Sequence, residues 1–263
     1  MEQSALFFDI DGTILSEVTC SIPESALQAL KRAGENGHLV FINTGRTWCT
    51  LPEEVKNAPF DGYLCGCGTY ILYRGEVLFA KSMEPERGRR VLEKMEECRI
   101  EGFCEAVNDI YLPKRITRFP EIERHKAAFR KRHLGERHFL EKKDFVYDKI
   151  FVYVDEQSRV QEFWDEIAED MDAIDREGGR YEIVPKGYSK ATACELILKR
   201  FGIPKERCYV FGDSSNDLAM FEYAPHAIAM GKHSPVLEPY TEFVTRTVEE
   251  DGIAYALSHY GFV

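Results

Sequence analysis

Three short apolar runs of the chain each end in residues that are able to bind a cation or a phosphate. They end in Phe8-Asp9-Ile10-Asp11-Gly12-Thr13, in Ile42-Asn43-Thr44-Gly45-Arg46 and in Phe211-Gly212-Asp213-Ser214-Ser215-Asn216-Asp217. If the runs are parallel strands of one sheet, the loops at their carboxyl ends gather at one edge, where ligands bind. The carboxylates of Asp9, Asp11, Asp213 and Asp217 would then converge.

Converging carboxylates repel one another, and their charged forms are costly unless a cation lies among them. These motifs offer hard oxygen ligands and contain no histidine or cysteine. Such a ligand set favours Mg²⁺, which usually shares a phosphate with its substrate. Each motif alone also has an ordinary structural explanation, since Asp11-Gly12 could be a plain turn and Gly212-Asp213 a capped helix entrance. The full Asp-x-Asp-Gly-Thr pattern, placed directly after a strand, is far more specific.

The elements that must position these residues alternate between strands and helices. Ala5–Phe8 is a continuous apolar run, as are residues 39–42 and 208–211, and this is typical of buried parallel strands. Between the first two runs, residues 21–24 (Ser-Ile-Pro-Glu) predict a capping box that opens a helix, and Gly37 predicts its end. Strand, helix and strand in this order predict a right-handed crossover in a parallel sheet.

The same alternation returns near the end of the chain. Residues 190–201 predict a helix that Gly202 closes, residues 218–223 a short helix, and residues 227–230 and 243–245 two short strands. The middle is richer in charge, and residues 148–154 and 181–184 read as half-exposed strands separated by a helix over 158–171. Half-exposed strands with helices predict a sheet that is covered on one face, hence an inserted α+β domain.

The predicted fold is therefore α/β. A Rossmann-like core with a parallel sheet takes residues 1–82 and 187–263, and an inserted α+β cap domain takes residues 83–186. The sequence carries no signal for an oligomeric state.

Composition narrows the function. The chain has 263 residues, and 34 basic against 45 acidic residues give a net charge of −11, which makes nucleic acid and anionic membranes unfavourable partners. No run approaches the ~20 apolar residues of a membrane helix, and the first residues do not resemble a signal peptide. We interpret the eight cysteines as reduced thiols, because this is no small secreted scaffold. We expect a cytoplasmic enzyme that acts on a small molecule.

The motifs resemble those of a known superfamily. Asp9-Ile10-Asp11-Gly12-Thr13, Thr44, Lys190 and residues 212–217 look like the four ordered motifs of the haloacid dehalogenase (HAD) superfamily. Residues 182–187 (Glu-Ile-Val-Pro-Lys-Gly), followed by Ser189-Lys190, and residues 251–254 (Asp-Gly-Ile-Ala) resemble its Cof-type subgroup, HAD-IIB, which has a large α/β cap. The resemblance implies a magnesium-dependent phosphatase that hydrolyses a small phosphomonoester, such as a sugar phosphate or a phosphorylated cofactor, through an aspartyl-phosphate intermediate.

The resemblance also implies roles for single residues. Asp9 would be the nucleophile, and Asp11 would act as general acid and then as general base. Asp9 and Asp213 would hold Mg²⁺ through their carboxylates, Asp11 would hold it through its backbone carbonyl, and Asp217 would support the site from the second shell. The phosphate-binding residues would be Thr44, Gly45, Lys190 and Asn216, with Arg46 as a candidate substrate contact.

Two positions depart from the subgroup's usual pattern. Cys67-Gly68-Thr69 stands where Asn-Gly-Ala is usual, and Met230-Gly231-Lys232-His233 stands where Met-Gly-Asn-Ala is usual. Lys232 either brings positive charge to the site or faces solvent. Two other functions stay open at this point: a phosphomutase of the same superfamily, which would keep the same aspartates, and a non-catalytic sensor of a phosphate ligand.

Overall fold

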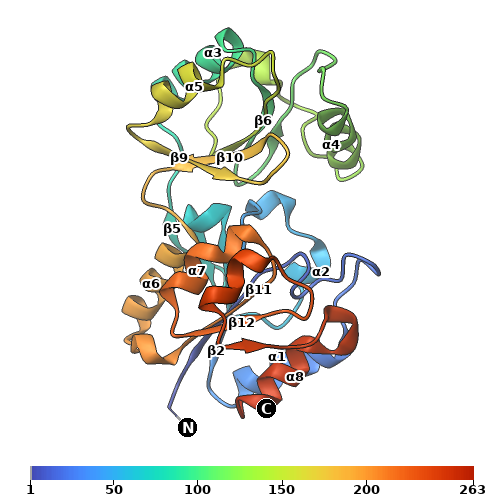
Figure 1. Ribbon diagram of the computed structural model, residues 1–263, viewed down its shortest axis with the longest axis vertical. Coiled ribbons are helices and arrows are strands. Elements are labelled where there is room, and N and C mark those ends of the chain that lie inside the picture. Colours follow the sequence, from blue (N-terminus) through green and yellow to red (C-terminus); the bar gives the residue numbers. More distant parts are fainter. Residues whose placement is uncertain (1) are drawn as a thin grey trace. The chain divides into compact units, whose positions relative to one another are not determined.

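The structure is a computed structural model that describes residues 2–263, and it divides into two compact units (Figure 1). The first unit contains the chain up to Arg46, Leu51–Ala80 and Tyr188–Val263, and the second contains Thr47–Thr50 and Lys81–Gly187. Each has its own sheet, mainly parallel in the first and antiparallel in the second. The predicted α/β class, with a parallel-sheet core and an added α+β part, is confirmed.

The sheet of the first unit has the strand order β13-β12-β11-β1-β2-β3-β4-β5. Its parallel strands are β1 (Ala5–Phe8), β2 (Leu39–Asn43), β3 (Gly62–Cys65), β11 (Cys208–Gly212), β12 (His226–Ala229) and β13 (Phe243–Val244). At one edge, β4 (Tyr70–Tyr73) and β5 (Glu76–Ala80) are antiparallel. The predicted strands at 39–42, 208–211, 227–230 and 243–245 are present within about a residue at each end, whereas β3, β4 and β5 were not predicted.

Helices of the first unit pack in pairs. α6 (Lys190–Phe201) packs against α7 (Leu218–Tyr223), and α1 (Glu24–Glu35) packs against α8 (Gly252–His259); α2 (Glu53–Lys56) is a single turn. Phe7 and Phe41 of the sheet are fully buried in one cluster with Ile197 of α6 and Phe221 of α7. This packing sets α6 against the strands that carry the motifs.

The predicted capping box at residues 21–24 does not form. The N-cap of α1 is Pro23, which offers no side-chain cap, and the Ile22 amide instead donates to the Glu54 carboxylate at 2.7 Å. A side chain 32 positions along the chain thus binds this segment in place of the local box. Gly37 does follow the helix end, with φ +91°.

The sheet of the second unit has the order β7-β6-β8-β10-β9. Its strands are β6 (Glu101–Glu105), β7 (Ile110–Tyr111), β8 (Lys149–Tyr153), β9 (Met171–Asp175) and β10 (Arg180–Pro185). α3 (Pro85–Glu97) and α5 (Val160–Ile167) share an apolar cluster with Cys104 of β6, whereas α4 (Pro120–Arg130) shares another with Phe103 (Figure 1). Because side chains alternate along a strand, the helices cover both faces of β6.

Two expectations for this region are wrong. Residues of β8 and β10 are mostly buried rather than half-exposed, because α4 and buried ion pairs occupy the face that was expected to be open. The helix expected over 158–171 ends at Ile167, and Met171 begins the edge strand β9. β9 pairs with β10 as an antiparallel hairpin across residues 176–179, so the end of the segment expected to be helical belongs to the sheet.

Within residues 2–263, the structure contains no helix long and apolar enough to cross a membrane.

Candidate active site

Strands β1 and β11 bring two predicted aspartates together. The strands pair in parallel, and the Asp9 amide donates to the Phe211 carbonyl at 3.0 Å. Asp9, Asp213 and Asp217 each offer one carboxylate oxygen, and these three atoms lie within 4.8 Å of one another. Burial raises the pKa of Asp9 to about 7, with Lys190 opposing and Asp217 adding to the rise. Burial and the Asp9 carboxylate raise the pKa of Asp213 to about 8.

Lys190 places a buried amine between two of these carboxylates. Its Nζ lies 2.7 Å from Asp9 Oδ1 and 2.6 Å from Asp217 Oδ1, and the side chain is 1% exposed. Burial disfavours the ammonium, but the carboxylates of Asp217 and Asp9 outweigh it and raise the pKa of Lys190 above its usual value. The site therefore contains a cation of its own.

The first turn of α6 holds Lys190 in place. Ser189 is the N-cap, and its Oγ accepts from the Thr192 amide while its own amide donates to Thr192 Oγ1 at 2.9 Å. Asn43, at the end of β2, donates from Nδ2 to the Lys190 carbonyl at 2.9 Å. Sequence reasoning missed this role of Asn43; the available signal was a polar residue at the end of a buried strand, next to Thr44.

Two glycines allow the loops to approach so closely. Gly12 has φ +80°, and a Cβ there would lie 2.5 Å from Asp213 Oδ2. A Cβ on Gly212 would lie 2.6 Å from Asp217 Cγ. Thr13 then donates from Oγ1 to Asp213 Oδ1 at 3.0 Å. Any side chain at Gly12 would displace the Asp213 carboxylate.

Asp217 is fully buried and uses both carboxylate oxygens within the protein. Oδ1 accepts from Lys190, and Oδ2 accepts from the backbone amides of Asp213 at 2.9 Å and Ser214 at 3.0 Å. These bonds hold the loop that presents Asp213. Asn216 Oδ1 accepts from the Ser214 hydroxyl at 2.7 Å in the same loop.

Asp11 lies outside the carboxylate cluster, so three carboxylates converge rather than four. Its two oxygens accept from Arg46, at 2.6 Å from Nε and 2.7 Å from Nη2. This two-point ion pair fixes both side chains, which are partly exposed. The Arg46 amide donates to the Oγ1 of buried Thr44 at 3.2 Å, and Gly45 between them is also buried. Thr44, Gly45 and Arg46 thus form one turn beside Asp11.

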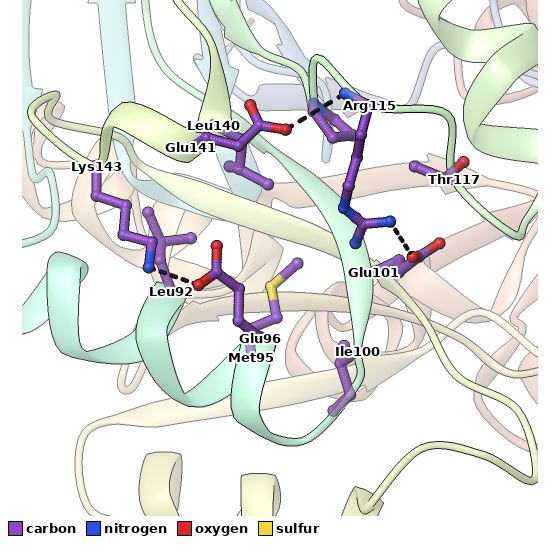
Figure 2. Close-up of a pocket in the computed structure, with 12 residues that line it drawn as sticks. Leu92, Met95, Glu96, Ile100, Glu101, Arg115, Thr117, Leu140, Glu141 and Lys143 are labelled. Atoms are coloured by element: carbon purple, nitrogen blue, oxygen red, sulfur yellow. Dashed lines mark hydrogen bonds and ion pairs between the residues drawn. The ribbon is translucent and has the colours of Figure 1, made fainter.

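Two other features lie away from these contacts. Lys232 has a side chain that is 87% exposed, 3.8 Å from Glu17, which favours the solvent-facing interpretation. A surface pocket in the second unit has Met95 among its lining residues, with Arg115 bonded to Glu101 (Figure 2). None of the predicted site residues lines this pocket.

Comparison with known proteins gives a consistent picture. Residues 6–257 match the family of haloacid dehalogenase-like hydrolases. The chain is 26% identical to "Putative phosphatase YkrA" of Bacillus subtilis (strain 168) over 100% of both chains. It is 23% identical to the 5-amino-6-(5-phospho-D-ribitylamino)uracil phosphatase YitU of the same organism, over 96% of this chain and 95% of that one.

Among solved structures, the HAD subclass IIB sugar phosphatase BT4131 matches with a TM-score of 0.83 and 25% identity, over 99% of this chain and 100% of that one. The family match spans nearly the whole chain and includes every residue of the site described above. The four motifs predicted this relationship, and the prediction is confirmed: the chain belongs to the family of haloacid dehalogenase-like hydrolases.

Proposed function

We propose that this hydrolase is a magnesium-dependent phosphatase that hydrolyses a small phosphomonoester through an aspartyl phosphate on Asp9. The observation that carries the proposal is the buried cluster in which Lys190 lies between Asp9 and Asp217, with Asp213 beside them. A nucleophilic carboxylate, a fixed positive charge and further carboxylates for a cation are what phosphoryl transfer to a carboxylate requires.

The residues fit a divalent cation that prefers oxygen. The cluster contains only carboxylates, and burial raises the pKa of Asp9 and Asp213, so a cation among them would favour their charged forms. Asp9, Asp213 and the Asp11 carbonyl would hold Mg²⁺. Asp217 would act from the second shell, because Lys190 and two backbone amides already engage its oxygens. Bound Mg²⁺ would neutralise charge on the phosphoryl oxygens.

Three residues of the chain would carry out the two steps of the reaction. Asp9 attacks phosphorus, and the bond from phosphorus to the ester oxygen breaks while Asp11 gives that oxygen a proton. Asp11 next takes a proton from the water that attacks the phosphorylated Asp9, which releases phosphate and restores the Asp9 carboxylate and the Asp11 carboxylic acid. Lys190 balances the negative charge of the transferred group.

The remaining predicted contacts lie on loops at the same edge of the sheet. Thr44 and Gly45 follow β2, and Asn216 lies in the loop after β11, so we propose that they bind phosphoryl oxygens. Arg46 follows in the same turn as Thr44 and is the proposed contact with the organic part of the substrate.

The substrate class is proposed from the relatives. One relative carries the name of a phosphatase for a phosphorylated ribitylamino-uracil, and one solved neighbour is a sugar phosphatase. We propose a sugar phosphate or a phosphorylated cofactor precursor, with residues 83–186 acting as the cap that selects it.

The test is a phosphate-release screen over such metabolites with Mg²⁺ and with a chelator, using wild type and Asp9→Asn. We expect turnover of at least one metabolite, loss of activity in chelator, and loss of activity in Asp9→Asn, because an amide is a poor nucleophile and a poorer Mg²⁺ ligand. Circular dichroism checks that Asp9→Asn is folded. Asp9→Asn activity within about tenfold of wild type would contradict the nucleophile assignment, since losing a nucleophile costs far more.

Product analysis separates the two other functions. A phosphomutase would move phosphate within a sugar without releasing it, and a sensor would bind a phosphate ligand without turnover by the wild type.

A further inference from the structure

A four-residue segment of the chain belongs to a different unit from its neighbours in sequence. Thr47–Thr50 is part of the second unit, although the residues up to Arg46 and from Leu51 belong to the first. Arg46, the residue just before this segment, forms the two-point ion pair with Asp11. The peptide bond between Arg46 and Thr47 therefore joins the two units at the residue whose guanidinium binds the proposed general acid.

Contacts on both sides of this junction are well defined. On the Arg46 side, its amide donates to Thr44 Oγ1 and its carbonyl accepts from the Gly66 amide at 2.8 Å. On the other side, Thr47 is 2% exposed, and its Oγ1 donates to Glu105 Oε2 at 3.3 Å. Glu105 is itself 6% exposed and is paired with Lys149 at 3.4 Å, so its carboxylate is a fixed acceptor.

Two further contacts hold the segment. Arg132 follows α4 and donates to the Thr50 carbonyl at 2.9 Å and to the Cys49 carbonyl at 3.4 Å. Cys49 donates from Sγ to the Ala106 carbonyl at 3.2 Å, and burial raises the pKa of this thiol to about 12, so it retains its hydrogen. Thr47, Cys49 and Thr50 are thus each bound, through a side chain or a carbonyl, by residues elsewhere in the second unit.

We propose that the second unit positions the Asp11–Arg46 pair through its hold on Thr47–Thr50, with Glu105 and Arg132 as positioning residues. Neither residue touches the reacting atoms. Their bonds hold the segment that continues the chain from Arg46, so they restrain the Arg46 backbone at its carboxyl side. The inference rests on the proposed function, in which Asp11 protonates the leaving oxygen.

The sharpest readout compares two esters of similar shape, phenyl phosphate and p-nitrophenyl phosphate. The nitro group makes nitrophenolate the better leaving group, so its departure depends less on a proton from Asp11. The measured quantity is kcat/KM, because it reports only the steps up to departure of the phenol. Asp11→Asn calibrates the assay, since it should lower kcat/KM more for phenyl phosphate than for the nitro ester.

The test variant is the double substitution Thr47→Val and Arg132→Ala, which removes the hydroxyl donor without changing its shape and removes the bonds to both carbonyls. We expect kcat/KM for phenyl phosphate to fall about tenfold and that for p-nitrophenyl phosphate to fall by less than about threefold, because a small misplacement weakens acid catalysis without abolishing it. Thr47→Ser, which keeps the hydroxyl, should behave as wild type. Glu101→Gln controls for the loss of a buried contact elsewhere in the second unit and should leave the ratio unchanged, because Glu101 lies on the same strand as Glu105 with similar burial, but bonds to Arg115 and Arg118.

A second measurement needs no catalysis. Trp48 and Trp164 are the two tryptophans of the chain, so a Trp164→Phe background makes fluorescence report the segment alone. Acrylamide should quench Trp48 more readily in the double variant than in the background protein. Unchanged quenching, or increased quenching with an unchanged ratio between the two esters, would overturn the inference. Wild type that hydrolyses neither ester, or Asp11→Asn that leaves the ratio unchanged, would instead contradict the proposed function on which the inference rests.

Discussion

Lys190 is a buried cation whose removal would leave two carboxylates facing each other. Its amine is within 2.7 Å of both Asp9 and Asp217, and all three side chains are nearly inaccessible to solvent. Breaking such a buried pair costs about 3–5 kcal/mol, because a charge is left without compensation. We therefore expect Lys190→Met to lower the free energy of unfolding by about this amount in chelator.

Urea unfolding monitored by circular dichroism measures this loss. Adding Asp217→Asn to Lys190→Met removes one of the two unpaired charges, so the double variant should be more stable than Lys190→Met alone. A double variant that is less stable than Lys190→Met would show that charge imbalance is not the cause.

Asp148 is a buried acid in the second unit that no proposed chemistry uses. Burial raises the pKa of Asp148 from 3.8 to about 6; the bond from Ser82 Oγ at 2.6 Å opposes the rise, and Glu105 adds to it. Because the folded pKa is raised, stability falls as pH rises from about 4 through 6 and stays reduced above that range.

Replacing Asp148 by Asn retains an oxygen for Ser82 and removes the charge. We expect Asp148→Asn to raise the free energy of unfolding above pH 6, by at most about 3 kcal/mol, and to have little effect at pH 4. Urea unfolding at both pH values measures this difference. An equal effect at the two pH values would mean that packing, rather than ionisation, decides the outcome.

Among the elements, the first turn of α6 determines where Lys190 lies. The N-cap Ser189 satisfies the Thr192 amide, and loss of an N-cap costs about 1 kcal/mol. We expect Ser189→Ala to lose about that much stability and also to lower kcat/KM, because Lys190 is the first residue of the helix. Ser189→Asn, which retains an acceptor oxygen, is the matched control. If both variants behaved alike in unfolding and in kinetics, the cap would have no role in placing Lys190.

At the scale of the whole molecule, the proposed division of labour assigns phosphoryl chemistry to the first unit and substrate choice to the second. All proposed catalytic, metal and phosphate residues belong to the first unit. Replacing residues 81–187 by a short linker should therefore raise KM severely for a preferred metabolite, and affect a small generic ester such as acetyl phosphate far less.

The structure adds a condition to this experiment. The same deletion removes the partners of Thr47–Thr50, so the truncated protein should also lose part of its acid catalysis toward poor leaving groups. Circular dichroism must first show that the truncated protein is folded. A folded protein that kept the same preference among metabolites would place specificity in the first unit.

The residues of the chemistry were predictable because their signals are local. Apolar runs identify β1, β2 and β11, and the polar residue that ends each run has to lie at the carboxyl edge of the sheet whatever surrounds it. The helix at residues 190–201 was predictable from its closing Gly202. The structure accordingly gathers Asp9, Asp213, Asp217 and Lys190.

Only the tertiary structure reveals the hydrogen bonds and ion pairs between residues that are distant in sequence. Asp11 pairs with Arg46 rather than joining the carboxylates, and the Ile22 amide donates to Glu54 in the segment where a capping box was predicted. Glu101 and Glu105 of β6 are buried although they are acidic, because cations from elsewhere in the second unit pair with them. Thr47–Thr50 also belongs to the second unit because of distant partners. It bonds to Glu105, Ala106 and Arg132, which are between 50 and 90 residues away along the chain, so its own local sequence could not reveal this assignment.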